Sequence, residues 1–266
     1  MLYVGTSGFS YADWRGVFYP QTMKQSDFLS YYSQRFDCVE LNFTYYRQPA
    51  ARAMEAMAAR VPDSFRFTVK AHRTMTHEIP QESLVAGEFE KFRQGILPVA
   101  ESGKLGCVLF QFPWSFRPSK NNYDYVLSLP DRLDHAPIVV EFRNNAWARD
   151  EVYESLRQRG LGFCCVDEPD LRGLFPRVAV VTSQVSYLRF HGRNAAKWFK
   201  HKEAWERYDY LYNRDELAWW IPKVLQMEGA SEDTYVFFNN CHQGQAAVNA
   251  VQMQELLLQA QARPKS

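Results

Sequence analysis

The sequence lacks the marks of several protein classes. Its 266 residues contain no apolar run near the ~20 residues that a membrane span needs. The first residues, MLYVGTSGF, lack the basic stretch and long apolar stretch of a signal peptide. The net charge is only +1, so the whole molecule has no electrostatic footprint for nucleic acid, although a local basic patch is compatible with it. We therefore expect a soluble protein of cytoplasmic type that does not enter a membrane.

Patterns that bind metals are also scarce. The five cysteines are an odd number, no CxxC occurs, and four of the five lie inside apolar runs, which is typical of free buried thiols. This spacing argues against a zinc knuckle, and neither HxH nor HExxH occurs. A divalent metal held by His72, His191 or His242 with acidic residues stays open but is not favoured.

Eight short apolar runs predict strands, at residues 2–7, 37–41, 65–71, 105–112, 138–142, 162–167, 186–191 and 234–239. Strand–helix alternation to the end of the chain favours an α/β fold with a single (β/α)8 TIM-like barrel, one domain over residues 1–266. The runner-up is a doubly wound sheet, which normally has GxGxxG after its first strand. Here that turn reads GTSGFS. No repeat, low-complexity tract or linker divides the chain.

Amphipathic stretches predict helices between these strands. They are expected at residues 28–36, 50–60, 89–100, 150–159, 215–227 and 245–261. The helix after the fourth strand is weakly signalled at 123–129, and the segment after the sixth strand, 171–181, is expected to be short or irregular. These segments supply the outer layer that a barrel requires.

Charged and amide side chains gather at the carboxyl ends of the predicted strands. Four strands end with polar pairs two residues apart, Glu40/Asn42, Lys70/His72, Glu141/Arg143 and Arg189/His191, and three others end with Gln111, Asp167 and Asn239. Residues i and i+2 of a strand point to the same face. We expect these side chains to face the barrel axis and to converge on its C-terminal mouth, where TIM barrels carry their active sites.

Several segments resemble the DUF72 family, also called YecE-like proteins. They are GTSGFSYADWRGVFYP, FDCVELNFTYYR, FRFTVKAHRTMTHE, LGCVLFQFPWSF, VVEFRNNAW and YLRFHGRN, and they are spread over nearly the whole chain. The resemblance implies a TIM-barrel-like fold but little chemistry, because the family is named for its unknown function. Its barrel has been compared with the endonuclease IV and xylose isomerase type, which is an analogy of fold. No segment here matches that endonuclease's metal-ligand pattern.

The acidic residues at the expected mouth are candidates for catalysis. Glu141 and Asp167, with His191 and Glu40, would transfer protons or act as a nucleophile. The alternative is that each acid is the buried partner of a nearby cation, since a buried charge without a partner is strongly penalised.

The other polar residues are candidates for binding a ligand. Lys70, Arg143 and Arg189 suit a phosphate or carboxylate, unless they serve only to neutralise the acids, which they equal in number. The remaining expected contacts are Asn42, His72, Gln111, Asn239, Lys197 and Trp198. The last two begin a long basic and aromatic segment that suits bases or sugars, or else forms a solvated helix. The loop SGFSYADWRGVFYP is either an anion cradle or a lid packed on its own aromatics.

Three functions remain open from the sequence. The first is a hydrolase or lyase that acts on a phosphate-bearing ligand, such as a nucleotide or nucleic acid. The second is a metal-free glycosidase that uses two of the carboxylates. The third is a non-catalytic protein that binds a ligand or nucleic acid. Neither the cofactor nor the oligomeric state has a signal in the sequence.

Overall fold

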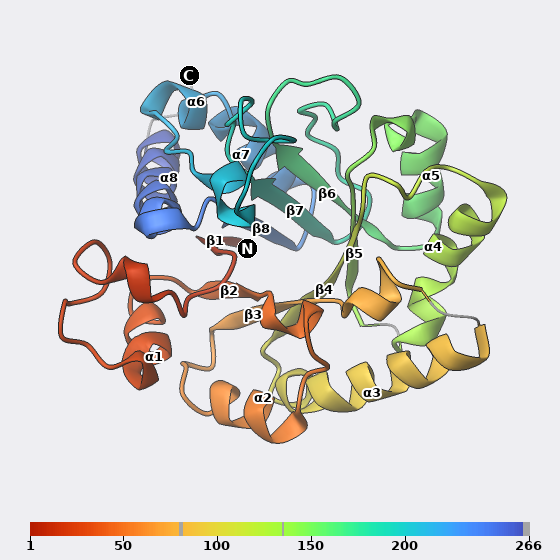
Figure 1. Cartoon of the computed structure of the whole chain (residues 1–266), viewed down its shortest axis with the longest axis horizontal. Coiled ribbons are helices and arrows are strands. Elements are labelled where there is room, and N and C mark those ends of the chain that lie inside the picture. The colour runs from red at the N-terminus through yellow and green to blue at the C-terminus, as the bar shows by residue number, and fades with distance from the viewer. Residues whose placement is uncertain (80–81, 135, 263–266) are drawn as a thin grey trace.

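A ring of eight parallel strands, surrounded by helices, forms the protein (Figure 1). The computed structural model describes residues 1–79, 82–134 and 136–262. The strands are β1 (Leu2–Thr6), β2 (Cys38–Leu41), β3 (Arg66–Lys70), β4 (Leu105–Phe112), β5 (Ile138–Phe142), β6 (Gly162–Asp167), β7 (Val185–Phe190) and β8 (Asp233–Phe238). Hydrogen-bonded neighbours follow the order β1-β8-β7-β6-β5-β4-β3-β2. The predicted (β/α)8 fold is confirmed, and each strand end lies within one residue of its expected position.

The barrel is nearly closed at the seam between β1 and β2. One parallel bridge, Ser7 to Glu40, joins the two strands just beyond the end of β1. Nearer the start of the two strands, Gly5 on β1 lets the backbones of β1 and β2 come close together. A Cβ at this position would lie 2.4 Å from the carbonyl oxygen of Cys38 on β2. The seam therefore depends on a glycine that the apolar pattern alone does not single out.

The described helices are α1 (Phe28–Tyr32), α2 (Ala51–Ala58), α3 (Glu82–Glu101), α4 (Lys120–Arg132), α5 (Asp150–Gln158), α6 (Arg214–Ala218), α7 (Ile221–Gly229) and α8 (Gln245–Gln261). The expected helix at 215–227 is two helices, and Pro222 lies in the first turn of α7, where its missing N–H costs nothing. Residues 171–181 contain no helix, as expected. Among the helices that the structure describes, none combines the length and apolar character needed to cross a bilayer.

Alternate residues of each strand fill the barrel axis. The hydroxyl of Tyr187 lies 2.8 Å from Thr68 Oγ1 and donates to Glu40 Oε2 at 2.7 Å, so strands β7, β3 and β2 meet inside the ring. The opposite parity, which includes Val140 and Phe142 on β5, is buried and apolar. This packing leaves the polar strand ends as the upper layer of the interior.

Candidate ligand-binding site at the barrel mouth

Arg189 is the centre of a buried ion-pair network. It extends from β7, and its guanidinium donates to Glu40 Oε1 at 2.7 Å and to Glu141 Oε2 at 2.6 Å. All three residues are at most 1% exposed. One cation thus joins two carboxylates that come from β2 and β5, as the parity of the strands predicted.

Glu141 has two further partners. The Nε of Arg143 lies 2.5 Å from its Oε1, and the Nε2 of His191 lies 3.3 Å from the same oxygen. Although burial opposes the charge, Arg143 and Arg189 hold the pKa of Glu141 well below its usual value. Burial, with Arg143 nearby, lowers the pKa of His191 well below its usual value. Glu141 is therefore an anion beside a neutral imidazole, and His191 is held in place by Asn239 at 3.1 Å.

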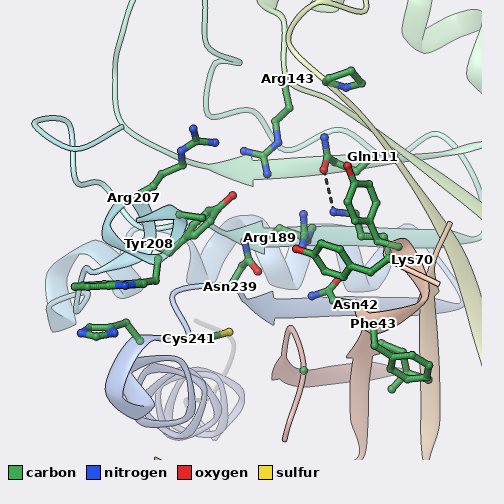
Figure 2. Close-up of a pocket in the computed structure, with 18 of the residues that line it drawn as sticks. Asn42, Phe43, Lys70, Gln111, Arg143, Arg189, Arg207, Tyr208, Asn239 and Cys241 are labelled. Carbon is green, nitrogen blue, oxygen red and sulfur yellow. Dashed lines mark hydrogen bonds between the residues drawn. The ribbon is translucent and has the colours of Figure 1, made fainter. Parts of the chain in front are cut away.

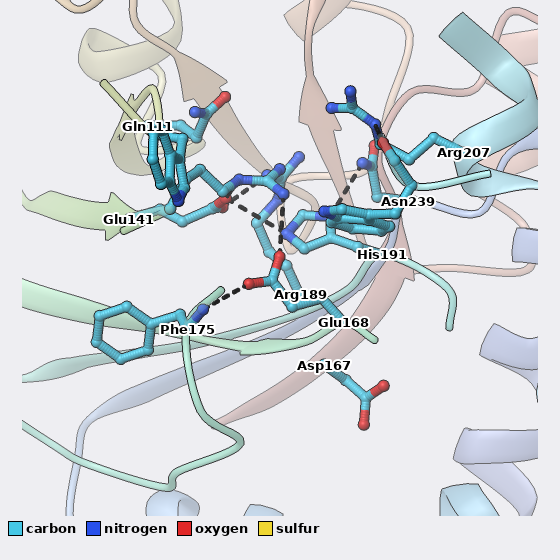
Figure 3. Close-up of polar contacts among 12 residues, drawn as sticks. Gln111, Glu141, Asp167, Glu168, Phe175, Arg189, His191, Arg207 and Asn239 are labelled. Carbon is cyan, nitrogen blue, oxygen red and sulfur yellow. Dashed lines mark hydrogen bonds and ion pairs between the residues drawn. The ribbon is translucent and has the colours of Figure 1, made fainter. Parts of the chain in front are cut away.

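Glu168 is a member of this network that the sequence analysis missed. Its Oε2 lies 3.3 Å from Nη1 of Arg143, and its Oε1 accepts from the backbone N–H of Phe175 at 2.9 Å (Figure 3). Burial raises the pKa of Glu168 to about 7 in spite of Arg143. Cys164 on β6 points to the barrel axis, because its Sγ lies 3.7 Å from Glu141. Alternate residues of a strand point to the same face, so Glu168, four residues later, also points to the axis.

Asp167 has the opposite parity, and its expected place at the mouth is wrong. Figure 3 shows it apart from the ion-pair network. Its Oδ1 accepts from Arg193 at 2.7 Å and from the Tyr212 hydroxyl at 2.9 Å. Its Oδ2 accepts from Arg193 at 2.6 Å and from Trp220 Nε1 at 2.7 Å. Both residues at the end of β6 are acidic, so hydropathy alone did not decide which faces inward.

A cavity of about 980 Å³ lies above the network at the mouth (Figure 2). Its lining includes the cations Lys70, Arg143, Arg189 and Arg207. Among the described residues that line it, none is an aspartate or a glutamate. The acids are thus beneath the floor, and the cations of the floor and wall face the open space.

Aromatic residues form much of the wall. They are Phe9, Tyr11, Phe43, Tyr45, Tyr46, Trp114, Trp198, Phe199, Trp205 and Tyr208. Arg207 stacks against two of them, with its guanidinium carbon 5.5 Å from the Trp198 ring centre and 5.9 Å from that of Tyr208. The segment after β7 therefore contributes to the mouth through a short 3-10 helix at Ala204–Tyr208. A capping box of Glu203 and Glu206 caps the N-terminus of this helix.

Lys70 occupies a distinct position in the floor. It lies at the end of β3, donates to Gln111 Oε1 at 3.0 Å, and has its amine 4.6 Å from the centre of the Tyr45 ring. Within the part of the chain that the structure describes, no carboxylate forms an ion pair with it. Burial and Arg189 lower the pKa of Lys70 to about 7.

The structure brings most of the expected binding residues to the cavity: Asn42, Lys70, Gln111, Arg143, Arg189, Asn239 and Trp198 line it. Two do not. His72 turns away to Thr74 at 2.8 Å and caps a short 3-10 helix, and Lys197 pairs with Glu206 at 2.6 Å on the outside. In the loop after β1, Trp14 is fully buried and donates to the carbonyl of Cys241, so it belongs to the packed lid, whereas Tyr11 reaches the cavity.

The donor set does not favour a metal. Over residues 1–79, 82–134 and 136–262, no three His, Cys, Asp or Glu side chains come together as ligands. The carboxylates of the network are instead engaged with arginines. The fold and its mouth thus define a (β/α)8-barrel protein with a buried ion-pair floor and a cationic, aromatic cavity.

The chain belongs to the family described as protein of unknown function DUF72, whose model matches residues 3–266. It is 35% identical to the UPF0759 protein YunF of Bacillus subtilis (strain 168) over 97% of this chain and 95% of that protein. A solved DUF72 family protein from Thermotoga maritima is 45% identical, with a TM-score of 0.90 over 97% of this chain and 99% of the other. One from Enterococcus faecalis is 29% identical, with a TM-score of 0.87 over 100% and 99%. The resemblance expected from the sequence segments is confirmed.

Proposed function

We propose that the mouth binds a ligand with both a phosphate group and an aromatic ring, of which a nucleotide is the simplest. The observation that supports this most is the separation of charge. Four cationic side chains line the cavity, while the carboxylates that neutralise part of this charge lie below the floor. An anion in the cavity therefore meets guanidinium and ammonium groups without a carboxylate beside it.

The floor also offers polar atoms that bind no other protein group. Arg189 Nε and the Oδ1 of Asn42 are buried and have no hydrogen-bond partner within the described protein. Both residues line the cavity. An unsatisfied buried polar group costs about 1–3 kcal/mol, so a ligand that supplies an acceptor to Arg189 and a donor to Asn42 gains that free energy.

The aromatic wall supports the second half of the proposal. Tyr208 and Trp205 lie on the same wall as Arg207, and Trp205 stacks on His242 with ring centres 4.2 Å apart. A base that stacks on such a ring contributes about 1–3 kcal/mol. A volume of about 980 Å³ lies within the range of small-molecule sites and accommodates a nucleotide.

The geometry supports acid/base hydrolysis by two carboxylates less well. Glu40 and Glu141 are fully buried and held by the same arginine, so neither presents an oxygen to the cavity. A glycosidase requires one carboxyl group that donates a proton to the leaving oxygen, and the lowered pKa of Glu141 opposes that role. The proposal therefore assigns these acids to the support of Arg189 and Arg143.

A thermal-shift series tests the proposal. AMP, adenosine, inorganic phosphate and an oligothymidylate are compared on the wild type, on Arg207→Ala and on Arg52→Ala, an exposed arginine of α2 that serves as the control. A ligand at 100 times its Kd should add about 2.7 kcal/mol to stability. We expect AMP to stabilise the wild type and Arg52→Ala more than adenosine does, and Arg207→Ala to lose most of that gain. Equal effects of AMP and adenosine would contradict the proposal.

A further inference from the structure

Lys70 differs from the other cations of the cavity in its surroundings. Arg143 and Arg189 both pair with Glu141, whereas Lys70 has only a neutral amide oxygen at 3.0 Å and the ring of Tyr45. A lysine that serves only as a counter-ion lies beside an acid. Lys70 instead lies in a half-buried floor whose nearest charges include two arginines.

The charges around Lys70 come from several strands. Arg189 on β7 disfavours an ammonium ion there most strongly, Glu141 and Glu40 favour it, and Arg143, just after β5, adds the weakest of these effects against it. Burial has the largest effect, and the pKa falls to about 7. About half of the amine is then neutral at pH 7, against roughly one part in 2,500 for an ordinary lysine with a pKa of about 10.4. A desolvated lysine next to other cations is a recognised form of activated nucleophile.

We propose that Lys70 forms an imine with the carbonyl carbon of an aldehyde or ketone that also carries a phosphate group. The position of the amine supports this, because it is free of ion pairs at the floor of a cavity whose other cations can hold the phosphate. The claim that the substrate carries a phosphate rests on the proposed function. The claim that Lys70 forms an imine does not. The inference gives the site a substrate class, phosphorylated carbonyl compounds, and a reaction type, imine-forming lyase or isomerase chemistry.

The step needs no cofactor. The lone pair of the neutral Lys70 nitrogen attacks the carbonyl carbon, and a proton passes from nitrogen to the carbonyl oxygen to give a carbinolamine. Loss of the hydroxyl group with the second amine hydrogen releases one water molecule and leaves a C=N bond. His77 lines the same cavity, and its ring packs edge-on against Tyr45 with centres 4.9 Å apart. Burial, together with Lys70, lowers the pKa of His77 to about 4, so its imidazole is neutral and adds no further positive charge beside the amine.

The chain contains two lysines that make suitable internal controls. Lys104 is more deeply buried than Lys70, but its amine donates to the carbonyls of Ala58 and Val61 at 2.9 and 3.0 Å, lies 3.3 Å from Asp63 Oδ1, and lines no part of the cavity. Lys120 is exposed on α4 and pairs with Asp124 at 2.6 Å. Neither lies in the cationic cavity, and each has a carboxylate beside its amine, so labelling at Lys70 alone separates a site effect from general lysine reactivity.

Reductive trapping tests the inference on the intact wild-type protein. Pyridoxal 5′-phosphate and pyridoxal, which differ only in the phosphate, are each incubated with the protein near neutral pH and reduced with borohydride, and the adducts are located by peptide mass mapping. Because of its larger neutral fraction, Lys70 should be labelled at least about tenfold faster than Lys120 by the phosphorylated probe, with Lys104 unlabelled. AMP should slow the labelling, and Lys70→Arg should abolish the adduct at that position.

The outcomes separate the two proposals. If Lys70 is labelled no faster than Lys120 while AMP still binds, the imine inference is wrong and the proposed function stands. If pyridoxal labels Lys70 as fast as its phosphate does and AMP does not compete, the amine is reactive but the phosphate site is wrong. Fast labelling of Lys70 that depends on the phosphate and is blocked by AMP supports both.

Discussion

Arg189 and Glu141 are joined by a hydrogen bond of 2.6 Å that crosses the interior of the barrel from β7 to β5. The same guanidinium also reaches Glu40 on β2, and Arg143 lies 2.5 Å from Glu141, so the two carboxylates are balanced by two guanidinium groups. In the layer below the cavity, the acids are therefore the buried partners of nearby cations, which is the alternative to a catalytic role for them. This pairing does not account for Lys70 and Arg207, which face the cavity from above that layer.

Replacing Arg189 should destabilise the protein strongly. Arg189→Met leaves Glu40 and Glu141 buried with one guanidinium fewer, and breaking a buried pair in this way costs about 3–5 kcal/mol. Urea denaturation measures the loss, with Arg52→Ala as the control. Adding Glu40→Gln and Glu141→Gln to Arg189→Met should recover part of the stability. A loss below about 1 kcal/mol for the single variant would show that the network contributes little.

Asp167 should matter for stability and not for the ligand. Asp167→Asn weakens two hydrogen bonds to Arg193, and the loss of a charged acceptor in this buried cluster should cost about 1.5–3 kcal/mol. The affinity for AMP should stay within about twofold of the wild type, because the carboxylate faces away from the mouth. A selective loss of AMP binding with unchanged stability would restore Asp167 to the site.

Glu168 should make stability fall as the pH rises. Its pKa is raised to about 7 in the folded protein, above the ordinary value of 4.5, so the folded state holds the proton longer than the unfolded state. The contribution of Glu168 to stability is full below pH 4.5 and is lost as the pH rises through 7. Relative to the wild type, Glu168→Gln should therefore gain roughly 2.5 kcal/mol between pH 5 and pH 8, as read from denaturation curves. A difference that does not change with pH would rule out this titration.

Gly5 should be required for the β1–β2 seam. In Gly5→Ala the new methyl group would lie 2.4 Å from the backbone oxygen of Cys38, so the strands must separate. We expect a loss of at least about 2 kcal/mol, consistent with overpacking of a core. Gly87 on α3 has no atom within 4 Å of an added Cβ, and Gly87→Ala should stabilise by about 0.5–1 kcal/mol. Thermal unfolding of both variants measures these changes. Similar effects of Gly5→Ala and Gly87→Ala on stability would contradict this account of the seam.

The sequence predicted the barrel well because strand periodicity is set by burial, which leaves a direct trace in hydropathy. The same periodicity placed Glu141, Arg143 and Arg189 at one mouth. It failed at the end of β6, where Asp167 and Glu168 are both acidic and only contact with a neighbouring strand decides which one faces inward. It also missed Arg207, because the path of a long segment over the mouth depends on tertiary packing such as that between Arg207 and Trp198.

Side-chain directions in the loops could not be predicted from strand periodicity either. His72 has the parity of Lys70, but the chain leaves β3 at Lys70 and His72 caps the next turn by accepting from Thr74. Lys197 lies next in sequence to Trp198, yet one faces solvent and the other the cavity, since neighbours in an irregular segment need not share a direction. Parity holds only while the backbone remains a strand.

The central claim is that the cavity recognises phosphate and ring together, and calorimetric titration of the wild-type protein with AMP and with adenosine tests it most directly. Arg143, Arg189, Arg207 and Lys70 all line the space that a phosphate would enter. We predict that AMP binds at least about tenfold more tightly than adenosine, since hydrogen bonds to charged groups contribute about 1.5–3 kcal/mol, and that the difference shrinks as salt is added. Equal affinities, or no heat from either ligand, would contradict the claim.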